Sequence, residues 1–458
     1  MRSGLRVVID AMLMVLLFVL LMTASALGQA TRLWVLRAPG EHAPAEMVEY
    51  DPATFVVKQT VKVPAEAVQS PGNLAVNRLG QMLYVAQVSL PLSEEDGAAE
   101  HKVWLWNGHA AGVTAPTIVA PTIIAPTIID QGVKREASTT GSNQAITESV
   151  PVAYLSADGT HLFWFANEAR RLEREAVDLS TATTWQAWQT DLNGAGREEL
   201  SMSKFPDCRC KTGTCEESCP YGVVWTPEGG VGKFFLMTQF VAGQTAPVFK
   251  ASTRYREDGG KWIAEALAEP LQRVLDASPD GKMIVEAIPD TGCCGWANQS
   301  DDQTLVVSEG KKITVFDEQE TYKNADYDVS FYTANARLSP ELEAVGMTIV
   351  STAEANKPIQ LAQEGQANPE ESVRIRKALA ELPAVEIKSM EVKSVDGKSG
   401  ENAPRRVAFV PHATLVGWIS EKEILLVEDH VLVAYNVSTG ARRKSTVRVG
   451  DAGRVFLR

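Results

Sequence analysis

A tight turn followed by a short apolar strand recurs along this chain, and this recurrence constrains the fold more than any other feature. One copy is Ser156-Ala157-Asp158-Gly159, which precedes the apolar run Leu162-Phe163-Trp164. An acidic residue next to glycine suits a tight turn because glycine accepts a positive φ and the carboxylate binds nearby backbone amides. Further copies, some of them diverged, are Asn77–Gly80, Thr226–Gly229, Ser278–Gly281, Ser300–Gln303, Ser339–Glu341 and Ser420–Glu423.

Short strands bounded by turn residues fill most of the chain after residue 30. They are rich in β-branched and aromatic side chains, and Gly, Asp, Asn or Pro stands at their ends. Many short strands without interleaved helices indicate a sandwich, a barrel or a propeller. Examples of these strands are Leu33–Leu36, Met82–Gln87, Val103–Trp106, Leu162–Ala166, Phe234–Gln239, Thr304–Val307, Lys312–Phe316 and Ile424–Val427.

A resemblance to known repeats narrows the choice. Ser278-Pro279-Asp280-Gly281-Lys282 and its diverged copies resemble the repeats of WD40-like and TolB-like β-propellers. Asp51-Pro52-Ala53-Thr54-Phe55, with Ser70-Pro71-Gly72-Asn73 behind it, is similar to the same class. The resemblance extends over most of residues 31–458. It implies a fold and not an activity, because propellers include both binding proteins and enzymes.

We therefore expect residues 31–458 to form one all-β domain, a β-propeller of six or seven four-stranded blades. A four-stranded sheet cannot cover its own apolar face, so neighbouring sheets must stack, and a closed ring leaves no exposed end. The motifs at Ser278 and Ser300 are too close for both to mark a blade. The segment Val407–Val449 predicts four strands, and we expect the strand near Leu33 to share a blade with the C-terminal part.

One insertion, residues 353–383, departs from the strand pattern. Asn368-Pro369-Glu370-Glu371 is a typical helix start. Apolar side chains then recur on one side of the expected helix, at Ile375, Ala378, Leu379 and Leu382. We expect one short helix that packs against the side of the propeller, and the alternative is a helix that captures a partner.

The first 28 residues predict a secretory signal peptide. Arg2 and Arg6 precede an uninterrupted apolar stretch, Ala11–Met22, and small residues follow up to Gly28. We expect cleavage after Gly28, with cleavage after Ala26 as an alternative, and a periplasmic or extracellular location. A further alternative is that the segment stays as a membrane anchor. No later segment predicts a membrane span after that cleavage. The formal charge of −13 argues against nucleic-acid binding, because such proteins need a basic surface.

Six cysteines form two tight groups, which is the most specific local feature. The cysteine-rich loop at residues 205–220 holds four of them and the pair Cys293-Cys294 holds the others. Export favours disulfides, and the loop lacks the C-x2-C spacing usual for a zinc site. The pairing cannot be read from sequence, and a strained bond between Cys293 and Cys294 is the sharper alternative. The loop cysteines are Cys208, Cys210, Cys215 and Cys219.

Propeller topology predicts that both cysteine groups lie on one face. The loop follows the fourth strand of a blade. Cys293-Cys294 lies either in a loop between second and third strands or, as the sequence favours, at the entry to a first strand. Either position puts it on the same face, where loops on a rigid scaffold commonly carry function. The expected ligand-binding residues there are Tyr221, Asp290, Trp296 and Asn298, although Trp296 could instead pack between blades.

No catalytic residue, metal site or cofactor is predicted. The chain has no G-x-S-x-G elbow, and its six histidines show no ligand spacing. Asp429-His430 is an adjacent carboxylate–histidine pair, and we interpret it as a turn. The sequence favours an exported binding protein whose partner is a protein, peptide or cell-envelope component. The alternatives are a metal-dependent hydrolase or lyase with its site at the central channel, and a redox module using Cys293-Cys294.

Overall fold

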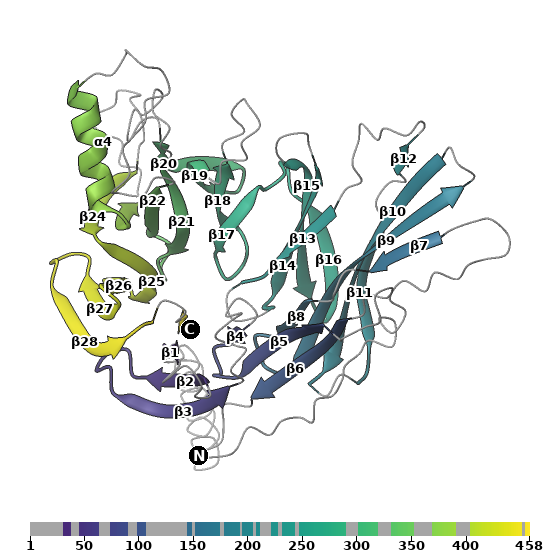
Figure 1. Cartoon of the computed structure of the whole chain (residues 1–458), viewed down its shortest axis with the longest axis horizontal. Coiled ribbons are helices and arrows are strands. Elements are labelled where there is room, and N and C mark those ends of the chain that lie inside the picture. Colours follow the sequence, from purple (N-terminus) through teal and green to yellow (C-terminus); the bar gives the residue numbers. More distant parts are fainter. Residues whose placement is uncertain are drawn as a thin grey trace, which may run out of the picture.

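The chain folds into a ring of antiparallel sheets, as a computed structural model of it shows (Figure 1). One helix, α4 (Pro369–Glu381), accompanies the strands in the part of the chain that the structure describes. That part comprises residues 31–37, 45–63, 74–89, 99–106, 144–148, 152–174, 178–192, 195–204, 208–210, 221–227, 231–242, 247–289, 301–318, 331–351, 369–390, 404–450 and 454–458.

Five of the sheets formed by the described strands have four strands each, and in each of them neighbouring strands are antiparallel. Their strand orders are β29-β1-β2-β3, β13-β14-β15-β16, β17-β18-β19-β20, β21-β22-β23-β24 and β25-β26-β27-β28. The bounds are β29 (Val455–Leu457), β1 (Leu33–Arg37), β2 (Ala45–Tyr50), β3 (Val57–Val63), β13 (Tyr221–Trp225), β14 (Phe234–Ala242), β15 (Pro247–Asp258), β16 (Lys261–Ala266), β17 (Arg273–Ala277), β18 (Met283–Pro289), β19 (Asp301–Ser308), β20 (Lys311–Asp317), β21 (Phe331–Leu338), β22 (Ala344–Ser351), β23 (Ala384–Ser389), β24 (Arg405–Pro411), β25 (Ala413–Ser420), β26 (Glu423–Glu428), β27 (Val431–Asn436) and β28 (Arg442–Arg448).

The two remaining sheets differ in strand number. One has three described strands, β4-β5-β6, and the other has six. Within the six, β8, β9, β10 and β11 form a four-stranded run, while β7 and β12 pair with the far ends of the long strands β9 and β10. The bounds are β4 (Leu74–Val76), β5 (Met82–Ser89), β6 (Ala99–Trp106), β7 (Gln144–Glu148), β8 (Val152–Leu155), β9 (His161–Arg174), β10 (Asp178–Asp191), β11 (Glu198–Lys204) and β12 (Cys208–Cys210).

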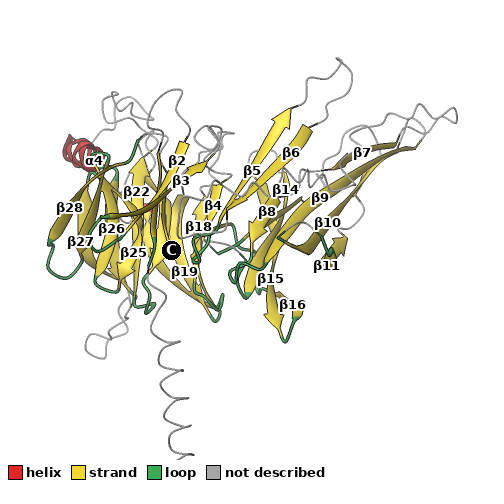
Figure 2. Ribbon diagram, turned by 90° about the horizontal axis from the view of Figure 1, so that it is seen from below, coloured by secondary structure: helices red, strands yellow, loops and turns green. Residues whose placement is uncertain are grey.

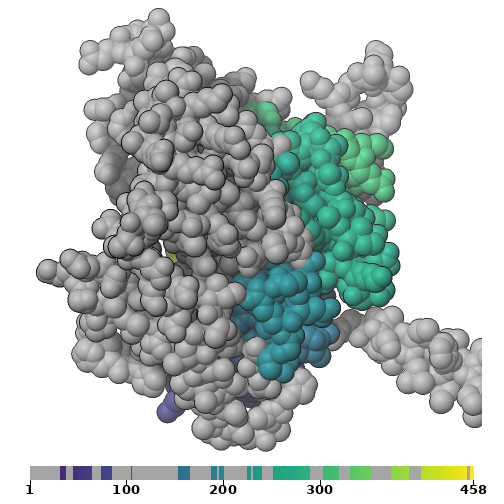
Figure 3. Space-filling view, turned by 90° about the vertical axis from the view of Figure 1, so that its right-hand side faces the viewer, coloured from purple at the N-terminus to yellow at the C-terminus, as the bar shows by residue number. Residues whose placement is uncertain are grey.

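An apolar cluster fills each junction between neighbouring sheets, which closes the ring. Trp34 and Tyr84 belong to the cluster between the β1 and β4–β6 sheets, and Phe165 contacts Phe235 between the β8–β11 and β13–β16 sheets. In Figure 3 the side of the ring that carries β15 and β16 faces the viewer. Sequential sheets stacked around an axis by such clusters define a β-propeller. The all-β fold with a single short helix expected from the sequence is therefore confirmed.

The chain ends share one sheet, because β29 pairs with β1. The strand near Leu33 thus shares a sheet with a strand near the C-terminus, but that strand lies beyond Val407–Val449, the segment with which the sequence predicted a shared blade. The prediction that this segment forms one set of four strands is wrong. Residues Val407–Val410 belong to β24, the fourth strand of the preceding sheet. The last sheet begins at β25, and β26 is its second strand. Each sheet begins after a connection and not at a fixed sequence interval.

The recurring motif is the turn between the first and second strands of a sheet. In the Ser278 copy, the hydroxyl donates to Asp280 Oδ1 at 2.6 Å and accepts from the amide of Met283 at 2.9 Å. Gly281 has a φ of +67°, as such a turn requires. The copies at Asn77, Ser156 and Ser339 occupy the same place in their sheets. Ser300, in contrast, directly precedes β19 between second and third strands, so it is the copy that marks no blade.

These turns define the two faces of the ring. Because strands alternate in direction, the first-to-second turns and third-to-fourth hairpins lie on one face, which we call the turn face. The second-to-third loops and the connections between sheets lie on the other, which we call the connection face. Figure 2 shows the ring edge-on, with the two sets of loops at opposite ends of the strands. No helix of the described part is long and apolar enough to span a membrane.

Helix α4 lies at the outside of the ring, as the sequence predicted for residues 353–383 (Figure 1). Ile375 and Leu379 are buried, and they pack in the cluster between the β17–β20 and β21–β24 sheets. Ala378 and Leu382 contact the same cluster at its edge. The helix therefore covers a junction between sheets, which confirms the expected packing.

Candidate functional site

Two adjoining cavities run along the axis of the propeller, lined mainly by the first strands of its sheets. The cavity at the connection face has a volume of about 770 Å³ and the one at the turn face about 470 Å³. Arg337, Val416 and Leu457 line both, so the two cavities form one channel, which we call the axial channel. Cavities of this volume are in the range of small-molecule sites.

The channel carries an excess of basic side chains. Its charged lining among the described residues consists of four arginines and two aspartates, together with two histidines. The whole chain, in contrast, has a formal charge of −13. A concave site lined by one sign of charge concentrates ligands of the opposite sign. The arginines, aspartates and histidines of the channel lining are Arg78, Arg337, Arg454, Arg458, Asp276, Asp429, His412 and His430.

Backbone carbonyls of neighbouring strands hold three of the arginines in place. Arg337 donates to the carbonyl of Leu275 at 3.1 Å, which joins β21 to β17. Arg458 donates to the carbonyl of Val76 at 2.8 Å, and Arg454 donates to β4 in the same way. Arg454 and Arg458, which flank β29, also lie over the ring of Phe456, at 5.1 and 5.5 Å from its centre. A carbonyl contact of this kind fixes the position of a guanidinium group, which keeps its positive charge at all accessible pH values.

Three polar residues of the connection-face cavity have left-handed backbone conformations. Their φ values are +55° for His412, +48° for Asp429 and +63° for His430. Asp429 and His430 form the two-residue turn between β26 and β27, where glycine or asparagine is usual. Left-handed residues other than glycine are strained, and such strain clusters at functional sites. The expected turn at Asp429-His430 is confirmed, but sequence reasoning missed that the pair shares a cavity with His412.

Asn335 adds an acceptor to the wall of this cavity. Its amide nitrogen donates to the carbonyl of Leu415 at 2.9 Å, which orients the side chain. Its buried Oδ1 accepts no hydrogen bond from the described residues. Buried acceptors normally have a partner, so this oxygen can receive a hydroxyl or amide donor of a ligand.

The residues predicted from sequence as ligand-binding are only partly described. Tyr221 begins β13 and pairs with Phe240 of β14, and its side chain is outside the described part. Asp290, Trp296 and Asn298 lie wholly outside the described residues, between β18 and β19. Their role as a site therefore stays a prediction.

The cysteines, too, are only partly described. Cys208 and Cys210 are the first and last residues of β12, and they pair with Thr181 and Leu179 of β10, respectively. Cys215, Cys219, Cys293 and Cys294 lie outside the described residues, as do the side chains of the first two. Cys293-Cys294 falls between a second and a third strand, which is the alternative that the sequence did not favour. The expectation that both groups lie on one face therefore stays a prediction.

The basic residues of the channel were missed at the level of sequence, although one signal was available. The recurring turn follows the first strand of a sheet, and first strands line the channel. Arg337 lies two positions before the Ser339 turn, so its place on the channel wall could have been predicted. Arg454 and Arg458 have no such signal, because no turn motif accompanies β29.

No group of three or more His, Cys, Asp or Glu side chains suited to a metal ion occurs among the described residues.

No protein-family model matches this sequence, and no curated protein matches it. The chain thus belongs structurally to the β-propeller class, which the ring of sheets and its axial channel define.

Comparison with solved structures gives matches of low sequence identity. Dipeptidyl peptidase 4 of Porphyromonas gingivalis is 7% identical with a TM-score of 0.35, and the match covers 91% of this chain and 60% of that one. The polysaccharide lyase Uly1 is 12% identical with a TM-score of 0.33, covering 94% and 89%. The SREBP-SCAP binding domains of fission yeast are 9% identical with a TM-score of 0.25, covering 89% and 86%.

Proposed function

We propose that this protein is an exported binding propeller that takes an anionic ligand into its axial channel. The observation that carries the proposal is the basic lining of the channel, four arginines against two aspartates, in a chain of net charge −13. Guanidinium groups bind carboxylates and phosphates in a bidentate manner, and both occur on acidic peptides and cell-envelope components. The ligand is therefore a carboxylate- or phosphate-bearing segment of such a partner.

The connection face is the proposed entrance. The larger cavity lies at that face, and we place the two cysteine segments there as well. In an oxidising compartment, disulfides among these cysteines would hold the rim loops around the entrance. Export and disulfide formation are parts of this proposal. Cell fractionation tests export, and recovery of the protein only in the cytosol would contradict it. Mass mapping of non-reduced peptides tests the disulfides, and free thiols on all six cysteines would contradict them.

Titration with a labelled pentaglutamate peptide tests the channel, with pentaglutamine as the uncharged control. We expect pentaglutamate to bind, and Arg454→Gln to weaken binding about tenfold or more, because a charge-assisted hydrogen bond contributes about 1.5–3 kcal/mol. Arg448→Gln makes the same charge change on the outer strand β28, and it should leave affinity within about twofold. Equal loss in both variants would reduce the effect to net charge, and no binding by the parent protein would reject the proposal.

A second candidate, an enzyme acting on an anionic substrate, is favoured by one specific observation. His412, Asp429 and His430 line the cavity in strained conformations, and imidazole and carboxylate groups are the usual acids and bases of catalysis. Mass analysis of a bound ligand after incubation separates the two functions. A ligand that returns unchanged supports binding alone. Turnover that is lost in both His412→Gln and His430→Gln supports the enzyme.

A further inference from the structure

A separate crevice lies between the β13–β16 and β17–β20 sheets, away from the axial channel. Its volume is about 380 Å³, within the usual range for small-molecule sites. Its walls combine apolar and charged side chains. The apolar residues are Leu267, Pro270, Leu271, Ile284 and Val307, and the charged ones are Arg254, Glu269, Lys282, Glu286, Glu309 and Lys312.

Glu286 is the unusual group in this crevice. It lies on the same side of β18 as Ile284, which faces the β13–β16 sheet, and its exposure is 3%. Among the described residues its carboxylate accepts one hydrogen bond, from the amide of Gln272 at 3.2 Å. A carboxylate can accept about four such bonds, so most of this capacity is unused.

Three other buried glutamates have arginine partners, whereas a fourth, Glu318, accepts a hydrogen bond from the amide of Phe331 at 2.7 Å. Arg406 binds Glu386 at 2.6 Å, while Arg442 lies 3.6 Å from Glu428. Arg32 likewise lies 3.7 Å from Glu49. Buried carboxylates are normally paired in this way, because an isolated charge in the interior is costly. Glu286 thus has the burial of Glu386, Glu428 and Glu49 without an arginine in ion-pair contact among the described residues.

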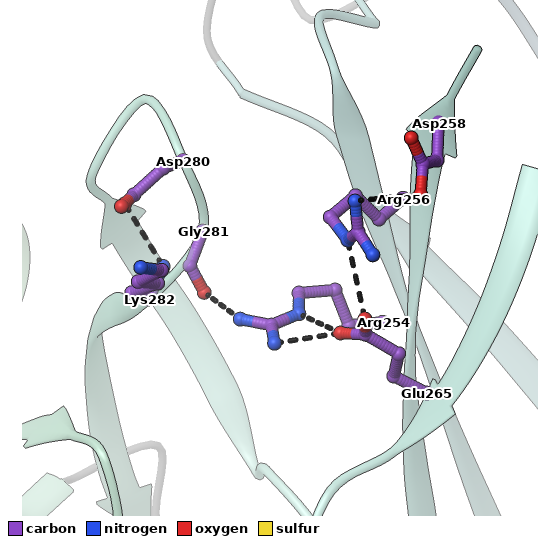
Figure 4. Close-up of polar contacts among 7 residues, drawn as sticks. All are labelled: Arg254, Arg256, Asp258, Glu265, Asp280, Gly281 and Lys282. Carbon is purple, nitrogen blue, oxygen red and sulfur yellow. Dashed lines mark hydrogen bonds and ion pairs between the residues drawn. The ribbon is translucent and has the colours of Figure 1, made fainter. Parts of the chain in front are cut away.

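The basic groups around Glu286 are bound to other acceptors or stand at the rim. Arg254 donates to Glu265 at 2.6 and 2.9 Å and to the carbonyl of Gly281 at 2.8 Å, which ties the two sheets together (Figure 4). Lys312 forms an ion pair with Glu269. Lys282 is exposed, as is Glu309 of the β19–β20 hairpin.

We propose that this crevice binds an organic ammonium ion, a small molecule with an apolar body and a primary amine. The apolar body would cover Leu267, Leu271 and Ile284, and the ammonium group would take the place at Glu286 that arginine takes at three other buried glutamates. An anionic or neutral ligand lacks that complement. This site is independent of the proposed function of the channel, whose basic lining repels such a ligand.

Calorimetric titration of the full-length protein with benzylamine tests the proposal, with benzyl alcohol and benzoate as ligands of equal shape. We expect benzylamine to bind at least tenfold more tightly than either. Glu286→Gln should weaken benzylamine binding at least tenfold, because it removes the charge and keeps the shape. Glu309→Gln, at the exposed rim of the same crevice, should change affinity less than twofold.

Leu267→Trp fills the crevice from its edge without altering Glu286 and should abolish binding. Circular dichroism of each variant confirms the fold before titration. Benzyl alcohol that binds as well as benzylamine, an unaffected Glu286→Gln variant, or no heat of binding at millimolar benzylamine would each overturn the proposal.

Discussion

Gly281 shows how one residue of the repeated turn serves both the turn and the packing between sheets. Its φ of +67° favours glycine, and a Cβ at this position would lie 2.8 Å from the ring of Phe234 in the preceding sheet. Gly310, in the β19–β20 hairpin, has a similar φ of +79°, but a Cβ there would have no atom of the described residues within 4 Å. Comparing substitutions at these two glycines separates the cost of a left-handed backbone from the cost of a steric clash.

We expect Gly281→Ala to destabilise the protein more than Gly310→Ala. Both substitutions cost about 1–2 kcal/mol for a left-handed alanine, and the contact with Phe234 adds roughly 1–3 kcal/mol. Urea unfolding of the two variants measures the difference. Equal free energies of unfolding would show that Phe234 moves aside without cost.

Glu286 makes the stability of the protein depend on pH. Burial raises the pKa of this carboxyl, because the charged form loses its hydration. Its contribution to stability is therefore fully present below the pKa of the unfolded state, about 4.3, and is lost as pH rises through the higher folded pKa. Glu286→Gln removes that loss and should be the more stable protein at neutral pH.

The measurement is the free energy of unfolding of Glu286→Gln minus that of the parent, between pH 4 and pH 8. The difference should grow with pH by about 1.4 kcal/mol for each unit by which the pKa is raised, and then level off. A difference that stays constant across this range would contradict the assignment.

At the scale of elements, helix α4 behaves as an amphipathic segment whose partner is supplied by two sheets. Ile375 is 1% exposed in the cluster beneath the helix, whereas Val373 on the opposite side is 67% exposed. The sequence predicted the apolar stripe from its helical spacing. It could not show that the stripe covers the junction between the β17–β20 and β21–β24 sheets.

We expect Ile375→Ala to lower the free energy of unfolding by about 2–5 kcal/mol, as usual for a buried aliphatic side chain. Val373→Ala should change it by less than about 0.5 kcal/mol, since exposed positions contribute little. Thermal and urea unfolding of both variants check this. A small effect at Ile375 would mean that the helix is not docked on the ring.

The long hairpin of β9 and β10 is the element that sequence reasoning described least well. The strand predicted at Leu162–Ala166 continues to Arg174 and pairs with β10 along its whole length. Its second half, Asn167–Arg174, is rich in charged residues and has no apolar alternation. Pairing with β7 and β10 sustains this strand through backbone hydrogen bonds, which side-chain patterns do not reveal.

At the scale of the whole molecule, the short strand β29 closes the ring. Phe456 is 2% exposed, and it packs with Trp34 and Tyr84 between two sheets. Arg454 and Arg458 lie over its ring and bind carbonyls of β4. One aromatic side chain therefore supports both the closure of the propeller and the placement of two basic groups of the axial channel.

We expect Phe456→Ala to cost about 3–5 kcal/mol, as for other buried aromatic residues, and to weaken pentaglutamate binding because Arg454 loses its support. Val407→Ala, at a position 45% exposed on β24, is the control and should alter neither property. Unfolding and ligand titration are measured together. Full stability in Phe456→Ala would show that closure does not depend on β29.

The class of fold follows from local patterns in the sequence. Turn residues, strand-length apolar runs and the helical stripe are such patterns, and each is decided by backbone conformation and by the burial of one side of an element. Ser278-Pro279-Asp280-Gly281 predicts its turn for this reason, and Ile375 with Leu379 predicts its helix. The union of the two chain ends followed from the need to leave no sheet edge exposed.

The surroundings of the axis and of the junctions between sheets, in contrast, depend on the packing of distant segments. Arg337, Arg454 and His412 are far apart in sequence and carry no shared pattern, and they meet because first strands from different sheets surround one channel. The place of Glu286 in a crevice between two sheets likewise depends on contacts between distant segments. Contacts between distant segments depend on how sheets stack, and that packing is set by the sum of all junctions and not by any local run of residues.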